Sequence, residues 1–257
     1  MKKTYLAMAV AAASLVAQPA LAQDYQMEAG LSYISYDYDV GSSDSAMGVD
    51  FRYNFETVST AGKPLAEAQF LGRNGGADLG YVAVDKADST TMSVGGDYWL
   101  DDIYVAASFI NHDDGTDKES AIGIKAGYML DDSLRVHLGF SNKGYVAGSG
   151  VNDDSTLSVG AKYTADMGGN YINLEGEFLN SSDYKIFGVS GDYYLTNELS
   201  AGIGLEKSDI SGADKMAIEL GANYFVMPNV SGEVAYTLNN NGRDKDNAIG
   251  LRVAARF

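Results

Sequence analysis

The stretch Asn247–Phe257, Asn-Ala-Ile-Gly-Leu-Arg-Val-Ala-Ala-Arg-Phe, decides the fold class. Large apolar side chains at Ile249, Leu251 and Val253 stand at every second position, and small or charged residues such as Arg252 fill the positions between them. Successive side chains of a β-strand point to opposite faces of the strand. The stretch therefore predicts a strand with one apolar face and one polar face.

The same alternation recurs from Gln26 onward, for example over 134–141 and 215–224. Turn-forming residues make tight connections at 101–102, 131–133, 196–198 and 227–229. Longer acidic stretches at 112–119, 147–154 and 239–246 lie between them. Alternating short and long connections are typical of an antiparallel up-and-down β-barrel.

Alternation by itself fits a soluble barrel or sandwich as well as a membrane barrel, because the two differ only in which face is turned outward. Three features favour the membrane. Small residues crowd the polar face, which suits a narrow or filled interior. Aromatic residues such as Tyr98 and Tyr224 gather near strand ends, and Phe257 ends an alternating strand. We therefore expect an all-β transmembrane barrel with its apolar face toward lipid.

The number of strands follows from parity, since single-chain outer-membrane barrels have an even number of strands. Fourteen strands fit best, and twelve or sixteen remain possible. The expected spans are 26–38, 46–55, 77–85, 90–100, 103–111, 120–130, 134–146, 155–163, 171–180, 184–195, 199–207, 214–225, 230–238 and 247–257.

The first 22 residues are expected to be a cleaved signal peptide and not part of the fold. Lys2 and Lys3 precede an apolar run over Tyr5–Val16, and Ala20-Leu21-Ala22 forms a small-x-small cleavage site. The run is too short to span a bilayer. Residues 23–257 then form the barrel, and loss of the two lysines takes the formal net charge from −17 to −19.

The composition of the chain excludes several classes of function. With 18 Lys and Arg against 35 Asp and Glu, the chain lacks the basic surface that nucleic-acid binding requires. With no Cys, it has no disulfide, thiol nucleophile or thiolate metal site. We expect no cofactor and no metal.

The connection Glu56–Gly76 is the longest in the chain, and its apolar residues argue against a free loop. Pro64 suits the first residue of a helix. One interpretation is a periplasmic turn tucked under the barrel, or an N-terminal extension of the third strand. The other is a periplasmic plug or constriction that involves Pro64, Leu65, Glu67 and Phe70.

The segment Gly62-Lys-Pro-Leu-Ala-Glu-Ala-Gln-Phe-Leu71, which leads into Ala77–Tyr81, resembles the matching region of the small "putative porin" family of gammaproteobacterial outer membranes. The signal peptide, the acidic composition, the Tyr-rich strands and Phe257 are similar as well. The resemblance is local in the N-terminal third and architectural beyond it. It implies passive diffusion of small solutes across the outer membrane and assigns no residue-level site.

Charged residues of both signs lie on the polar faces of the expected strands, where membrane depth tolerates them only if the interior is wet or the charges are paired. Opposed acidic and basic walls would set a transverse field across a pore, whereas salt-bridged filling would leave little flow. The candidate pore-lining residues are Arg52, Lys125, Arg135, His137, Lys162, Glu175, Glu177, Glu219, Glu233 and Arg252.

The expected extracellular loops carry many more acidic than basic residues. Such a mouth attracts cations and repels anions within a Debye length of about 8 Å. Divalent bridging to lipopolysaccharide phosphates and simple loop solubility are the alternatives. The candidate residues of this acidic mouth are Asp113, Asp114, Asp117, Asp153 and Asp154.

No constellation of catalytic residues stands out among two His and no Cys, so we expect no enzyme. His112 is expected in a solvated loop, and His137 is expected to face the lumen, where it is either hydrogen-bonded or a pH gate. The favoured function is an outer-membrane porin that passes small hydrophilic solutes and ions with a weak preference for cations. The alternative is a non-conducting structural or adhesive barrel. Expected partners are lipid and lipopolysaccharide, and the oligomeric state, monomer or trimer, stays open.

Overall fold

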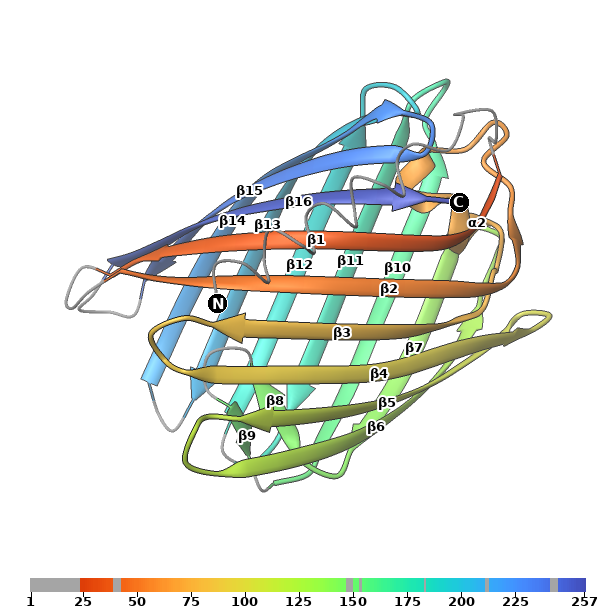
Figure 1. Ribbon diagram of the computed structural model, residues 1–257. Coiled ribbons are helices and arrows are strands. Elements are labelled where there is room, and N and C mark those ends of the chain that lie inside the picture. Colours follow the sequence, from red (N-terminus) through yellow and green to blue (C-terminus); the bar gives the residue numbers. More distant parts are fainter. Residues whose placement is uncertain are drawn as a thin grey trace.

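The structure is a computed structural model that describes residues 24–38, 43–146, 150–152, 154–182, 184–210, 213–240 and 245–257 (Figure 1). The expected signal peptide at 1–22 and Asp153 of the expected acidic mouth lie outside these residues. Within the described residues, no helix combines the length and the apolar character needed to cross a membrane.

Fourteen antiparallel strands form a closed barrel, so the predicted architecture and strand number are confirmed. Each strand pairs with the next along the chain, and the last strand pairs with the first. The barrel strands are β1 (Tyr25–Asp37), β2 (Asp44–Val58), β3 (Gly76–Val84), β4 (Ser89–Leu100), β5 (Ile103–Asp113), β6 (Lys118–Met129), β7 (Leu134–Ser141), β10 (Thr156–Asp166), β11 (Tyr171–Asn180), β12 (Tyr184–Tyr194), β13 (Leu199–Ile210), β14 (Ala213–Met227), β15 (Val230–Asn240) and β16 (Lys245–Arg256).

The expected strand over 134–146 was wrong in its second half. Strand β7 ends at Ser141, and β8 (Gly144–Val146) pairs with β9 (Gly150–Asn152) in a separate two-stranded sheet. The side-chain oxygen of Asn142 accepts the N–H of Ile122 at 2.7 Å and so replaces a partner strand there. Glycines then follow closely along the chain, and glycine weakens a strand.

The alternation in sequence becomes an alternation of exposure around the barrel. On β16, Ile249, Leu251 and Val253 are 49%, 50% and 56% exposed, whereas Ala254 and Arg256 are buried. Large exposed apolar residues recur in this way on every barrel strand. The apolar face is therefore outside, as a lipid-facing barrel requires.

The two ends of the barrel differ. We call the end where β1 begins and β16 ends the turn end, and the opposite end the loop end. Several loop-end connections are shorter than expected because strands run on past their predicted ends, whereas the β7–β10 connection is longer because β7 ends at Ser141. For example, β5 and β6 enclose only residues 114–117, where a loop over 112–119 was expected.

The longest turn-end connection, residues 59–75, folds into helices η1 (Leu65–Glu67) and α2 (Ala68–Leu71). We call residues 59–75 the turn-end segment. In Figure 1 its helix α2 lies within the ring of strands at the end where the C-terminus lies. The alternative of a β3 extension was wrong, because β3 begins only at Gly76. Pro64 is the N-cap residue of η1, one position before the first helical residue that was expected for it.

Candidate functional site: the barrel interior

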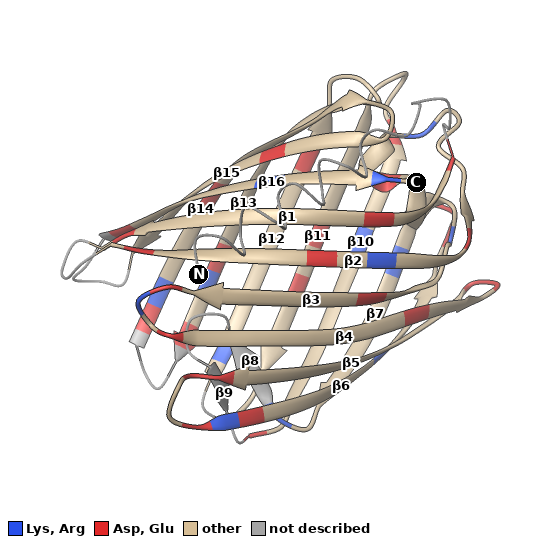
Figure 2. Cartoon of the chain, viewed as in Figure 1, with Lys and Arg blue, Asp and Glu red and all other residues tan. Residues whose placement is uncertain are grey.

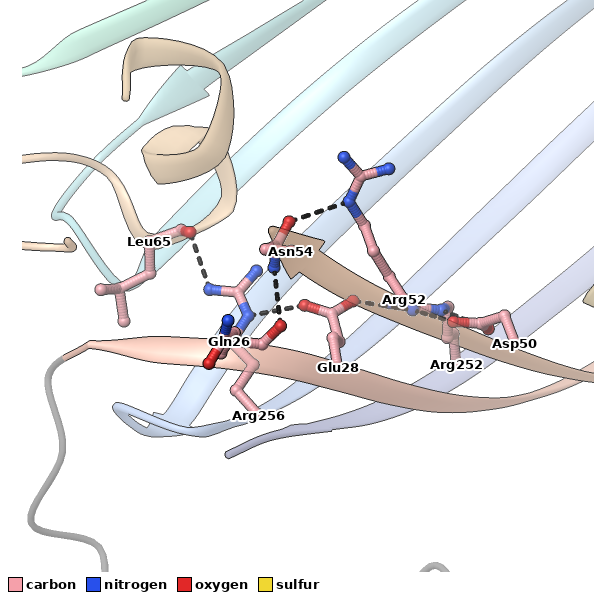
Figure 3. Close-up of polar contacts among 8 residues, drawn as sticks. All are labelled: Gln26, Glu28, Asp50, Arg52, Asn54, Leu65, Arg252 and Arg256. Carbon is pink, nitrogen blue, oxygen red and sulfur yellow. Dashed lines mark hydrogen bonds and ion pairs between the residues drawn. The ribbon is translucent and has the colours of Figure 1, made fainter. Parts of the chain in front are cut away.

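Charged side chains line the interior in groups that link strands distant in sequence. Figure 2 shows acidic and basic positions close together along β2, among otherwise uncharged strand residues. Across β16, β1 and β2, Arg252 Nη2 lies 2.9 Å from Glu28 Oε1 and 2.6 Å from Asp50 Oδ2. Arg256 Nε lies 2.6 Å from the other Glu28 oxygen (Figure 3). This group, Glu28, Asp50, Arg252 and Arg256, is called the seam cluster.

Arg52 forms the neighbouring group on β2. Its Nη2 lies 2.7 Å from Asp97 on β4, its Nη1 lies 3.6 Å from Asp78 on β3, and its Nε donates to Asn54 Oδ1 at 3.0 Å. Small residues on the inner face leave space for these ion pairs between neighbouring strands. A Cβ on Gly30 would lie 2.4 Å from Asp50 Oδ1, so a larger residue there would displace that carboxylate.

On the opposite wall the structure brings together Lys125, His137 and Glu177. Lys125 Nζ and His137 Nε2 lie 2.9 Å and 3.3 Å from the same oxygen, Glu177 Oε1. The His137 side chain is 7% exposed, and its Nδ1 is buried without a hydrogen-bond partner among the described residues.

Lys162 joins the wall to the turn-end segment. Its Nζ lies 2.6 Å from Glu175 Oε1 on β11 and 2.9 Å from Glu67 Oε2 on the segment. The other Glu67 oxygen accepts the Tyr194 hydroxyl of β12 at 2.9 Å. Glu67 is 6% exposed, so a buried carboxylate ties the segment to two strands.

Arg135 holds the segment through aromatic rings. Its guanidinium carbon lies 4.1 Å from the Tyr104 ring centroid, 5.8 Å from that of Trp99 and 5.6 Å from that of Phe70. Phe70 of the segment meets Trp99 edge-on at 6.5 Å. Stacking of this kind adds to the area that the rings bury.

The segment is anchored around most of the turn end. Leu65 N donates to Asn197 O in the β12–β13 turn at 2.8 Å, and Arg256 Nη1 donates to Leu65 O at 2.8 Å. Arg73, beyond α2, lies 2.8 Å from both Asp102 and Asp132 in two other turns. These contacts reach strands on opposite sides of the ring, so the segment lies across the turn-end opening.

The inner face of β12–β15 carries four carboxylates against one lysine, Lys215, near the loop end. Glu206 and Glu219 line an interior cavity of about 510 Å³, and Asp192, Glu219 and Glu233 line a second one of about 280 Å³ that also touches Glu67. Within the described part of the chain, Asp192, Glu206, Glu219 and Glu233 form no salt bridge. Neutral groups donate to two of them: Thr237 Oγ1 donates to Glu219 Oε2 at 3.1 Å, and Asn173 Nδ2 donates to Asp192 Oδ2 at 3.3 Å.

The expected acidic mouth is located at the loop end. Asp113 and Asp114 close the β5–β6 connection, where Asp113 lies 3.0 Å from Lys118 Nζ. The backbone N–H groups of Asp117 and Thr116 hold the pKa of the Asp114 carboxyl below its usual range. These carboxylates thus have a structural role as turn caps in addition to their charge. Asp154 lies two residues before β10, and Asp153 lies outside the described residues.

Over the described ranges, no three His, Asp or Glu side chains converge into a group that could hold a metal ion. His112, expected in a loop, lies within β5, and its Nδ1 is 2.9 Å from Thr91 Oγ1. The roles of Trp99, Tyr104 and Tyr194 were not predictable from the sequence. Aromatic residues near strand ends are also typical of the lipid–water interface, so their presence there does not indicate a contact inside the barrel. The inward parity of Tyr104 and Tyr194 was the one signal available.

Comparison with known proteins gives a consistent picture. The family described as "Putative general bacterial porin" matches residues 1–257. The crystal structure of the Acinetobacter baumannii outer membrane protein Omp33 superposes with a TM-score of 0.75 at 23% identity, covering 91% of this chain and 99% of that chain. A structure titled bacterial polysaccharide outer membrane secretin superposes with a TM-score of 0.55 at 10% identity, over 91% of this chain and 99% of that one. No curated protein sequence matches.

Proposed function

The chain belongs to the general bacterial porin family and is a β-barrel of the outer membrane, and from this premise we propose that it is a narrow, weakly cation-preferring channel for small hydrophilic solutes. The turn end faces the periplasm in this proposal, as short turns do in bacterial barrels. The residues that line the path are the interior charges already described.

One observation carries the proposal: the wall of β12–β15 holds four carboxylates that form no salt bridge in the described chain. A carboxylate at membrane depth is costly unless it is paired or hydrated. In the described chain, Asp192, Glu206, Glu219 and Glu233 form no salt bridge, whereas Glu28, Glu175 and Glu177 on the other walls do. Unpaired carboxylates favour a water-filled interior over one packed with salt bridges, and their charge favours cations.

The hypothesis of a transverse field across the pore requires an acidic wall and an opposed basic wall. The basic residues do not form a free basic wall, because Arg52, Lys125, Lys162 and Arg252 all lie within salt-bridge distance of carboxylates on nearby strands. Arg135 stacks on aromatic rings instead. The excess charge is therefore acidic and lies on one side. We infer that this wall contributes to cation preference together with the loop-end carboxylates.

The test is the reversal potential of purified protein in planar bilayers under a salt gradient. We expect a shift toward the cation side, and the double variant E219Q/E233Q should reduce it. The matched control is E198Q, which removes a carboxylate from an exposed turn outside the lumen and should leave the shift unchanged. A reversal potential on the anion side would contradict the proposal.

A second candidate, a non-conducting structural barrel, is favoured by the turn-end segment that lies across one opening. We propose that this segment narrows the channel without sealing it, since the cavity beside Glu67 continues along the acidic wall. Well-folded protein that gives no conductance in planar bilayers would favour the non-conducting alternative.

A further inference from the structure

The barrel closes where its first and last strands pair. Strands β1 and β16 are in register from Glu28 opposite Arg256 to Asp37 opposite Asn247. Backbone bonds continue the pairing to the turn end, where Phe257 O accepts the N–H groups of Gln26 and Met27. We call this pair of strands the seam. Every other pair joins strands that are neighbours along the chain, so the seam is the step that completes the barrel.

Arg256 sits at the turn end of the seam and contacts more than its own pair of strands. It is 8% exposed, and its guanidinium carbon lies 4.4 Å from the Tyr25 ring centroid and 4.5 Å from that of Phe225. Its Nε reaches Glu28 on β1, and its Nη1 reaches Leu65 O on the turn-end segment (Figure 3). One buried side chain thus touches β1, β14 and the segment.

We propose that Arg256 is a positioning residue that makes the seating of the turn-end segment, meaning its docked position across the turn-end opening, depend on closure of the β1–β16 seam. The planar guanidinium fork satisfies Glu28 and the Leu65 carbonyl at the same time, in one orientation fixed by the two rings. If β16 leaves β1, the fork loses Glu28 and the Tyr25 ring, and the Leu65 carbonyl loses its donor. The segment then loses its anchor on that side.

The coupling is reciprocal, because two equilibria that share one contact shift each other by the same factor. A second contact points the same way: Thr60 N on the segment donates to Asp24 Oδ1, directly before β1, at 3.3 Å. Within the described chain, the segment therefore binds both strands of the seam. A barrel with an open seam would hold the segment only at its anchors on the other walls, so the segment is fully docked only once the seam has closed.

Arg252 provides the comparison that separates seam from segment. It binds Glu28 and Asp50 across the same seam, yet its recorded contacts do not reach the segment. Removing Arg252 weakens only the contacts across the seam. Removing Arg256 weakens the contacts across the seam and also removes the hydrogen-bond donor to Leu65 O. If Arg256 transmits the coupling, then loss of Arg252 should affect the segment only while Arg256 is present.

The experiment uses maleimide labelling of A68C in the full chain, folded in detergent micelles. The chain has no Cys of its own, and Ala68 is 0% exposed against Tyr25 and Val58, so labelling reports unseating. We expect R256M to raise the labelling rate about tenfold or more, as the loss of a charge-assisted hydrogen bond implies. R252M should raise it several-fold with Arg256 present and no further in R256M.

The matched control is K125M, which removes a lumen cation that is paired with Glu177 far from the seam and should leave labelling unchanged. R256K keeps the charge but not the fork, so it should fold and label at an intermediate rate if R256M fails to fold. Quenching of Trp99, the single Trp, gives a second readout without a cysteine, since Phe70 lies against it. The proposal would be overturned if R256M or R256K were labelled at the wild-type rate. It would also be overturned if R252M raised the labelling rate equally with Arg256 present and in R256M. No outcome depends on conductance, so the result is separate from the porin proposal.

Discussion

Glu67 offers the sharpest perturbation of the turn-end segment. Replacing it by Ala removes two contacts at once, the 2.9 Å bond from Tyr194 and the 2.9 Å bond from Lys162. Tyr194 is 4% exposed, so its hydroxyl would be left buried without its recorded acceptor. Replacing Glu67 by Gln keeps an acceptor for Tyr194 and removes only the charge that faces Lys162.

The magnitudes follow from these contacts. Breaking a buried pair by removing one partner costs about 3–5 kcal/mol, and a hydrogen bond to a charged group is worth roughly 1.5–3 kcal/mol. Lys162 keeps Glu175 at 2.6 Å, which places E67A near the lower figure. At about 1.4 kcal/mol per tenfold, E67A should raise the unseated population of the segment by roughly a hundredfold, and E67Q by roughly tenfold.

The assay is single-channel recording in planar bilayers, with Trp99 quenching as a parallel measure of seating. E67A should show brief transitions to a higher conductance far more often than wild type, and E67Q should fall between them. The segment still has its anchors at Leu65 and Arg73, so we expect transient opening and not permanent loss.

The matched control is E175Q, which removes the other carboxylate from the same lysine. Glu175 belongs to the wall strand β11 and not to the segment, so E175Q should leave the frequency of these transitions unchanged. The reasoning is refuted if E67A matches wild type in both measurements, or if E175Q opens the channel as often as E67A does.

Two further predictions concern the wall and a turn. G160A should lower the free energy of unfolding by about 1–3 kcal/mol, because the new Cβ would lie 2.6 Å from His137 Nε2 and 2.8 Å from the backbone oxygen of Gly176. The loss should appear as a lower transition temperature in a heat-induced gel shift. G188A is the control, since no heavy atom lies within 4 Å of the added Cβ, and it should match wild type. Asp131 Oδ1 accepts bonds from Ser133 Oγ, Ser133 N and Leu134 N, and these hold the pKa of the carboxyl below its usual range. Its stabilisation is therefore present above the ordinary carboxyl pKa of about 4 and is lost as the pH falls through the lowered value. D131A should be less stable than wild type at neutral pH, and the gap should close on acidification; a gap that persists at low pH would contradict the assignment.

Much of the fold was predictable because a barrel strand records its environment in every second residue. The alternation over Asn247–Phe257 fixed which side chains of β16 face outward, and the same pattern located most strand centres within a few residues. Strand ends were less predictable. Polar residues such as Asp113 and Lys118 stayed in the ladder because they pair across it, which periodicity in a single strand does not reveal.

The partners of the interior charges were not predictable from the pattern. Parity places Arg252 on the inner face, but Asp50 and Glu28 are 202 and 224 residues away in sequence. Only closure of the ring brings these strands together. The predominantly acidic wall has the same origin, since its four carboxylates come from four strands and no single strand shows the group.

The sequence by itself therefore determined the class of fold, the face of each strand and the excess of acid, because each of these is a local property repeated along the chain. The tertiary structure alone decided which charges pair, which wall stays acidic and where residues 59–75 lie. The physical reason is that the sheet keeps two open edges until its last strand meets its first. At that step Arg256 meets Glu28 and Leu65, and neither contact exists in any shorter part of the chain.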